Sequence, residues 1–225
     1  MFPLHDTIKY HGATVATIGL IILSGLVYFY QISLGVDAFE HIFYNFGFIP
    51  VNFFSNPVGE FSTIFTSMFI HGSFVHLLGN VWFLWVFAPA VEGRLGFRRF
   101  MLLYLLSGIA AALLQGFSYP DAIIPMVGAS GAVSGVLGAY LLLFPRARVL
   151  TFIPPFFFFI FWLPAPIYLG YWVVLQFIYA MIEVQGVAWW AHIGGFLLGM
   201  VLVLIVRPKR IYKADPFWEC WRDYC

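Results

Sequence analysis

The chain has 225 residues, of which 62% are hydrophobic and 9% are charged, and its mean hydropathy is +0.92. A soluble fold of this size could not cover so much apolar surface, so the composition predicts an integral membrane protein. The formal net charge is +1, and no basic run with interleaved aromatic residues indicates a nucleic-acid partner. The partner that this composition indicates is the lipid bilayer.

Six apolar segments have the length of membrane-spanning helices, which need about 20 residues. They cover residues 14–33, 74–90, 100–116, 127–144, 167–182 and 188–206. We therefore predict an all-α, polytopic fold with a six-helix membrane domain at 14–206, a short N-terminal lead at 1–13 and a C-terminal tail at 207–225. The first segment lacks the features of a cleavable signal sequence, so we expect it to remain as an anchor.

The positive charges predict an orientation for these helices. All 11 Lys and Arg residues lie before the first segment, between the second and third, between the fourth and fifth, or after the sixth. The loops at 34–73, 117–126 and 183–187 contain none. The positive-inside rule then places both termini in the cytoplasm and these three loops outside. The loop at 34–73 is long and rich in aromatic residues, so it either lies partly in the membrane interface, where aromatic rings are favoured, or is only an ordered connection between two helices.

Cys220 and Cys225 both lie in the polar tail. Two cysteines are too few for a disulfide framework or for a zinc site on their own, so we interpret them as free thiols. We expect neither a metal ion nor another cofactor.

The second, fourth and sixth segments all begin at the outer face in this topology. Polar residues in their first turns therefore lie at similar depth, at ~1.5 Å per residue. They are His76 and Asn80 in the second segment, Ser130 and Ser134 in the fourth, and His192 in the sixth. Each could be a hydrogen-bonded packing residue, because a polar side chain in an apolar layer needs a partner. Their common depth favours a functional site.

Small residues recur at helical spacing in two of these segments. The stripes are Gly131, Gly135 and Gly138 in the fourth segment, and His192, Gly195 and Gly199 in the sixth. Taken alone, the first stripe is most simply a surface for close helix packing. If it meets the second stripe, Ser130 can approach His192.

Four motifs occur along the chain. They are His-Gly-Ser-Phe-Val-His-Leu-Leu-Gly-Asn at 71–80, Glu-Gly-Arg at 92–94, Gly-Ala-Ser-Gly at 128–131 and Ala-His-Ile-Gly-Gly-Phe at 191–196. Together, and in this order, they resemble the rhomboid family of intramembrane serine proteases. The Gly-x-Ser-Gly motif alone would not be specific.

The resemblance implies roles for the polar residues. Ser130 and His192 would form a catalytic dyad, and His76 and Asn80 would contribute to an oxyanion hole. The substrates would be transmembrane segments of other proteins, entering from the side and unwinding locally. We expect the site to open to the extracytoplasmic side of a plasma membrane.

The motifs also contain residues to which we assign structural roles. Glu92 and Arg94 are two positions apart on a helix and point away from each other, so each is expected to bind a different helix end or loop. The glycines of this group are Gly128, Gly131 and Gly195.

The chemistry of these side chains agrees with the implied roles. A serine hydroxyl needs a neighbouring base, and histidine titrates near neutral pH. The available donors to an oxyanion are the Ser130 N–H, the His76 imidazole and the Asn80 amide. Glu183 lies outside the span and no other Asp or Glu is near His192 in these helices, so a dyad is predicted rather than a triad.

The sequence departs from the family pattern at two places. The family often has an aromatic residue four positions after the nucleophile, packed on the catalytic histidine, and Ser134 occupies that place here. The Trp-Arg pair common in the first outer loop is also absent, since residues 61–64 read Phe-Ser-Thr-Ile.

Three other classes of function are alternatives to a protease. An inactive rhomboid-like protein that binds or escorts membrane-protein clients usually lacks the serine or the histidine, and both are present here. A transporter would show internal repeats or ionisable residues midway through several helices, and the sequence shows neither feature. A soluble-type serine hydrolase needs Gly-x-Ser-x-Gly after a strand, but Ala132 stands two positions after Ser130.

Overall fold

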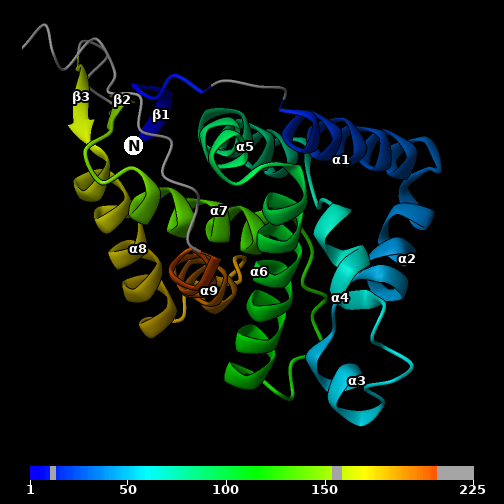
Figure 1. Cartoon of the computed structure of the whole chain (residues 1–225). Coiled ribbons are helices and arrows are strands. Elements are labelled where there is room, and N and C mark those ends of the chain that lie inside the picture. Colours follow the sequence, from blue (N-terminus) through cyan, green and yellow to red (C-terminus); the bar gives the residue numbers. More distant parts are fainter. Residues whose placement is uncertain (11–13, 154–158, 207–225) are drawn as a thin grey trace, which may run out of the picture.

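The computed structural model describes residues 1–10, 14–153 and 159–206 (Figure 1). Its helices are α1 (Val15–Ser33), α2 (Val36–Phe46), α3 (Pro50–Ser55), α4 (Thr63–Thr66), the 3-10 helix η1 (Ser67–Phe69), α5 (Phe74–Leu95), α6 (Phe97–Ser118), α7 (Ser130–Leu143), α8 (Ala165–Met181) and α9 (Trp189–Val206). Its strands are β1 (Phe2–Asp6), β2 (Arg148–Phe152) and β3 (Ile160–Pro164). The predicted tail, with Cys220 and Cys225, lies outside the described residues.

A helix occupies each of the six predicted apolar segments, with ends that differ by a few residues. Among the described residues, α1, α5, α6 and α9 are long and apolar enough to cross a membrane. Helices α7 and α8 are also apolar but have only 14 and 17 residues. The chain is thus mostly helical and has the character of a polytopic membrane protein.

Helix α7 is the central element of the fold. It contacts α5, α6, α8 and α9, which lie around it in Figure 1. Every residue from Gly131 to Tyr140 is buried. A helix enclosed in this way is apolar on all sides, which explains why its sequence shows no polar face.

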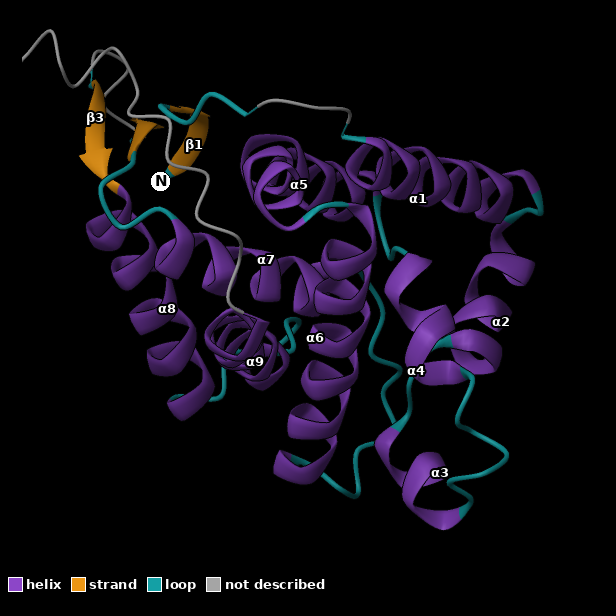
Figure 2. Ribbon diagram, in the orientation of Figure 1, coloured by secondary structure: helices purple, strands orange, loops and turns teal. Residues whose placement is uncertain are grey.

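A small antiparallel sheet corrects the prediction of an all-α chain. Its strand order is β1-β2-β3, and it lies at one end of the helices beside the start of α8 (Figure 2). Strand β1 lies in the N-terminal lead at 1–13, and β2 and β3 lie between the fourth and fifth apolar segments. The prediction of an all-α chain was wrong because β1 and β2 are distant in the sequence, and neither has a pattern that identifies its partner.

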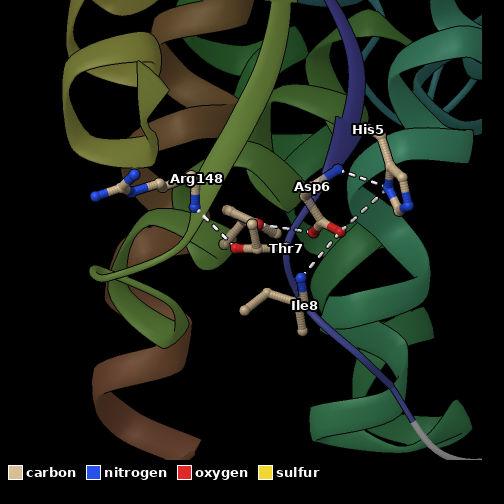
Figure 3. A network of polar contacts seen from close by, with 6 residues as sticks. His5, Asp6, Thr7, Ile8 and Arg148 are labelled. Atoms are coloured by element: carbon tan, nitrogen blue, oxygen red, sulfur yellow. Dashed lines mark hydrogen bonds and ion pairs between the residues drawn. The ribbon is translucent and has the colours of Figure 1, made fainter. Parts of the chain in front are cut away.

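Asp6 attaches this sheet to α7. Its carboxylate accepts a hydrogen bond from the Tyr140 hydroxyl at 2.7 Å. It also accepts one from the Ile8 N–H at 3.3 Å (Figure 3). Next to it, the Thr7 hydroxyl accepts a hydrogen bond from the N–H of Arg148 at 3.0 Å. Burial raises the pKa of the Asp6 carboxyl, because desolvation disfavours the charged form.

Glu92 connects the end of α5 to the start of α1. Its Oε1 accepts the N–H of Ala16 at 2.8 Å, and its Oε2 accepts the N–H and hydroxyl of Thr17 at 2.8 and 2.7 Å. The first N–H groups of a helix have no acceptor within the helix, so this carboxylate caps α1 from a neighbouring element. Arg94 lies half-buried in the last turn of α5, where a positive charge is favourable.

The loop at 34–73 is folded and is attached to the chain just before α7. The backbones of Phe48 and Met126 exchange two hydrogen bonds, of 3.0 and 2.8 Å, and Phe48 is fully buried. The N–H of Gly128 donates to the carbonyl of Ser67 at 2.8 Å. These contacts hold the loop although it lacks the Trp-Arg pair.

We predict that Glu92→Gln lowers the free energy of unfolding by about 2–3 kcal/mol, because hydrogen bonds to a charged group are worth about 1.5–3 kcal/mol and the amide would present a donor to the α1 N–H groups. Denaturation in detergent micelles measures this. Glu40→Gln, at an exposed position of α2, is the control and should change stability by less than about 0.5 kcal/mol. Equal stability of the two variants would contradict the capping role.

Candidate active site

Ser130 is the first residue of α7, and its position is set by the segment before it. Gly128 has φ +112°, a conformation that strains any residue with a Cβ. Its N–H bond to Ser67 fixes this turn against the outer loop. Ser130 is half-buried and begins a helix whose first N–H groups have no intrahelical acceptor.

His76 and Asn80 of α5 lie beside this turn. A Cβ added to Gly128 would be 2.5 Å from His76 Nε2 and 3.6 Å from Asn80 Nδ2. The side chain of Ser73 accepts the N–H of His76 at 3.1 Å and so caps the first turn of α5. The structure therefore brings both predicted oxyanion residues close to the chain two positions before Ser130.

The amide of Asn80 is a buried donor with no protein partner. Asn80 is 7% exposed, and its Nδ2 makes no hydrogen bond to any residue that the structure describes. Leaving such a donor unpaired costs about 1–3 kcal/mol. A group with this cost and this position is ready to receive an acceptor from a bound molecule.

The ring of His71 packs against the ring of His76. It is fully buried, and the two imidazole rings meet edge to face with their centroids 5.2 Å apart. The backbone of His71 exchanges hydrogen bonds with the Gln31 side chain of α1, at 3.2 and 3.4 Å. Burial, with a smaller contribution from His76, lowers the pKa of His71 to about 4, so this ring is neutral near pH 7.

Helices α7 and α9 meet backbone to backbone at their glycines. A Cβ on Gly195 would collide with the Gly131 carbonyl, and one on Gly199 would collide with the Gly135 carbonyl. A Cβ on Gly131 would lie 3.7 Å from the carbonyl oxygen of Ala191. The residue after Ser130 thus faces the residue before His192, as the two stripes suggested.

A small pocket lies at this junction. It is lined by α6, by the start of α7 with the turn before it, by the start of α9 and by η1 in the loop at 34–73. The lining includes Ser67, Gly108, Ala111, Gly128, Ser130 and Ala191. Ser130 and His192 are both half-buried rather than sealed in the core. The pocket therefore reaches Ser130, whereas His192, His76 and Asn80 do not line it.

His192 is held by side chains that the sequence did not identify. Its Nδ1 is 2.7 Å from Oε1 of Gln176, a buried residue of α8. The Gln115 side chain of α6 accepts the N–H of Ala191 at 3.3 Å. A glutamine in an apolar helix is costly unless it has a hydrogen-bond partner. The presence of Gln115 and Gln176 in apolar helices was therefore the feature of the sequence from which a polar partner could have been predicted.

Aromatic rings pack on His192 although Ser134 cannot. The Trp172 ring of α8 lies 5.9 Å from the imidazole at an interplanar angle of 32°, and Trp189 lies 6.0 Å away, edge to face. Ser134 instead donates its hydroxyl to the carbonyl of Ser130 at 2.6 Å. The described residues contain no group of three or more His, Cys, Asp or Glu that could hold a metal ion.

Comparisons with known proteins identify the family of the chain. Residues 58–209 match the family model of the rhomboid domain. The chain belongs to the rhomboid family, whose members are generally intramembrane serine proteases.

Relatives with this domain occur in mitochondria and in bacteria. The chain is 42% identical over 98 residues to Rhomboid protein 1, mitochondrial, of Saccharomyces cerevisiae, covering 41% of this chain and 28% of that protein. It is 28% identical over 184 residues to the human Presenilin-associated rhomboid-like protein, mitochondrial, covering 76% and 45%. It is 39% identical over 83 residues to Rhomboid protease GluP of Bacillus subtilis, covering 37% and 16%.

The similarity to these relatives covers only part of each protein, which limits the properties that can be assigned to this chain. The chain spans less than half the length of each of these relatives. They support a multi-pass membrane protein. Because mitochondrial proteins are among the relatives, they give no support to the predicted plasma membrane location.

We predict that Gly195→Ala lowers the free energy of unfolding by about 1–3 kcal/mol, because the added methyl group overpacks the contact with the Gly131 carbonyl. Gly170→Ala is the matched control, since nothing lies within 4 Å of a Cβ built at that helical position of α8. Thermal unfolding in detergent micelles compares the two. If both variants unfold at the wild-type temperature, α7 and α9 do not meet at these glycines.

Proposed function

We propose that this protein is an intramembrane serine endopeptidase that hydrolyses peptide bonds in or near transmembrane segments of other membrane proteins. The observation that carries the proposal is the glycine contact between α7 and α9, at which Gly131 faces Ala191. This contact supports a dyad of Ser130 and His192. The unpaired amide of Asn80 beside the same turn adds a donor that a serine nucleophile needs.

In the proposed reaction, Ser130 Oγ attacks the carbonyl carbon of the substrate while His192 Nε2 takes the hydroxyl proton. The His76 imidazole, the Asn80 amide and the Ser130 N–H bind the negative charge that develops on the carbonyl oxygen. His192 then gives its proton to the departing amine, and an ester remains on Ser130. Water, activated by His192, hydrolyses this ester and restores the serine.

The proposed topology has six spans within residues 14–206. Helix α7 has 14 residues, about 21 Å at 1.5 Å per residue, which is short for a bilayer core of about 30 Å. Helices α5, α6, α8 and α9 pack against it, so its ends need not reach lipid. Both termini would share the side with the Lys and Arg residues, and the site would open to the opposite side. Water would reach Ser130 from there.

The proposed substrate is a helix that unwinds at the site. A transmembrane helix satisfies its backbone hydrogen bonds internally, so a protease must open several of them to reach one peptide bond. Residues that weaken a helix, such as glycine and proline, lower this cost. We therefore expect cleavage to favour segments that contain them.

We predict that Ser130→Ala and His192→Ala each lower cleavage by at least about 10³-fold, because the nucleophile or its base is lost. The assay uses a reporter transmembrane segment in proteoliposomes. Ser33→Ala, at an exposed position of α1, is the matched serine control and should cleave at the wild-type rate. Cleavage by Ser130→Ala at that rate would contradict the proposal. Reporter binding without cleavage by the wild type would instead indicate a rhomboid-like protein that binds clients.

We further predict that Asn80→Ala lowers kcat by about 10²–10³-fold, the usual effect of removing one oxyanion donor. Its unfolding temperature should stay near that of the wild type, because the amide has no protein partner to lose. Asn52→Ala, at an exposed position of α3, is the matched amide control. A wild-type kcat for Asn80→Ala would make Asn80 a packing residue only.

A further inference from the structure

We propose that Gln176 is a positioning residue for His192, so that the site contains a third member on α8. This inference rests on the proposed function of Ser130 and His192 and deepens it. The dyad predicted from the sequence included no partner for the second imidazole nitrogen. The structure supplies a neutral one, since Gln176 Oε1 lies 2.7 Å from His192 Nδ1.

The orientation of the Gln176 amide is fixed by its other end. Its Nε2 donates to the carbonyl oxygen of Trp172 at 3.2 Å, one helical turn earlier in α8. A carbonyl oxygen only accepts, so the NH₂ group must point to Trp172 and Oε1 must point to the imidazole. Gln176 is 6% exposed, so water does not compete for this arrangement.

The amide oxygen in turn selects the tautomer of His192. Because Oε1 can only accept, Nδ1 must carry the proton in the hydrogen bond. The neutral ring then has its lone pair on Nε2, the nitrogen that takes the Ser130 proton in the proposed mechanism. Gln176 would thus do with an amide what a buried carboxylate does in a serine triad, which is to orient the ring and fix its tautomer.

A neutral partner suits this location. Within an apolar bundle an ionised carboxylate is expensive, whereas an amide needs only its two hydrogen bonds. Trp172 and Gln176 lie four residues apart on one face of α8, and both contact His192. One helix face therefore supplies the ring contact and the hydrogen bond.

Within residues 1–10, 14–153 and 159–206, the other elements around His192 present one titratable group. This is His76 on α5. Helix α6 presents the neutral Gln115 to the neighbouring Ala191, α7 presents Ser130 and Ser134, and α9 itself adds Trp189. A negative charge introduced at position 176 would therefore be the dominant change in the electrostatic environment of the His192 imidazole.

The test compares Gln176→Leu and Gln176→Glu in the reporter cleavage assay, with kcat and KM measured from pH 5 to 9. Gln176→Leu keeps the approximate volume but removes the acceptor, and we expect kcat to fall about 10–100-fold with little change in KM, as for a misplaced catalytic group. Gln176→Glu keeps an acceptor and adds a charge that favours protonated His192. At high pH, where His192 is deprotonated, kcat of Gln176→Glu should return towards the wild-type value. The acidic limb of its kcat profile should lie about 1–3 pH units higher than in the wild type, because the negative charge favours the protonated form of the imidazole.

The controls are Gln185→Leu and Gln185→Glu, at an exposed position after α8, which should match the wild type in kcat and pH profile. If Gln176→Leu does not fold, the pH profile of Gln176→Glu still decides. An unmoved acidic limb in Gln176→Glu, with or without a lower kcat, would overturn the positioning role. That result is distinct from failure of the proposed function, in which the wild type itself shows no cleavage that depends on Ser130.

Discussion

The close backbone contact between α7 and α9 is the interaction on which the rest of the structure depends. It exists because Gly131, Gly135, Gly195 and Gly199 carry no Cβ, and any side chain at Gly195 or Gly199 would meet a carbonyl of α7. In a membrane, helices associate through such packing rather than through exclusion of water. The same contact sets the distance between the first turns of both helices, where Ser130 and His192 lie. Packing and the proposed chemistry therefore have one cause.

The polar groups around this contact are held by neighbours on other helices. Glu92 caps α1 from the end of α5, Gln31 binds the backbone of His71, and Gln176 binds His192. Each bond connects two different helices or a helix and a loop, and satisfies a group that would be costly in an apolar surrounding. The amide nitrogen of Asn80 is buried beside the turn before Ser130 and has no acceptor among the described residues. Nε2 of His71 is also buried without a partner among them, so it is the position of Asn80 beside this turn, and not its unpaired state alone, that supports its proposed role as an oxyanion donor.

The sequence predicted the helices and the pairing of stripes better than it predicted the sheet and the support of His192. Apolar length locates a membrane helix without knowledge of its neighbours, and the glycine spacing on two helices indicated where they meet. The pairing of β1 with β2 joins segments that lie more than a hundred residues apart, as the contact of Asp6 with Tyr140 does. Gln176 is a single polar residue in an apolar helix, and no periodicity shows which histidine it faces. Contacts set by tertiary packing were therefore beyond the sequence alone.

Reaction of the protein in lipid bilayers with a serine-directed fluorophosphonate, followed by mass spectrometry of the labelled peptides, tests the central claim most directly. The probe needs an activated serine but no substrate, so it reports on the contact of α7 with α9 independently of substrate choice. We predict one labelled serine, Ser130, with labelling that is lost in His192→Ala and slowed in Gly195→Ala. Labelling at another serine, or labelling of Ser130 at the wild-type rate without His192, would contradict the claim that the glycine contact activates Ser130.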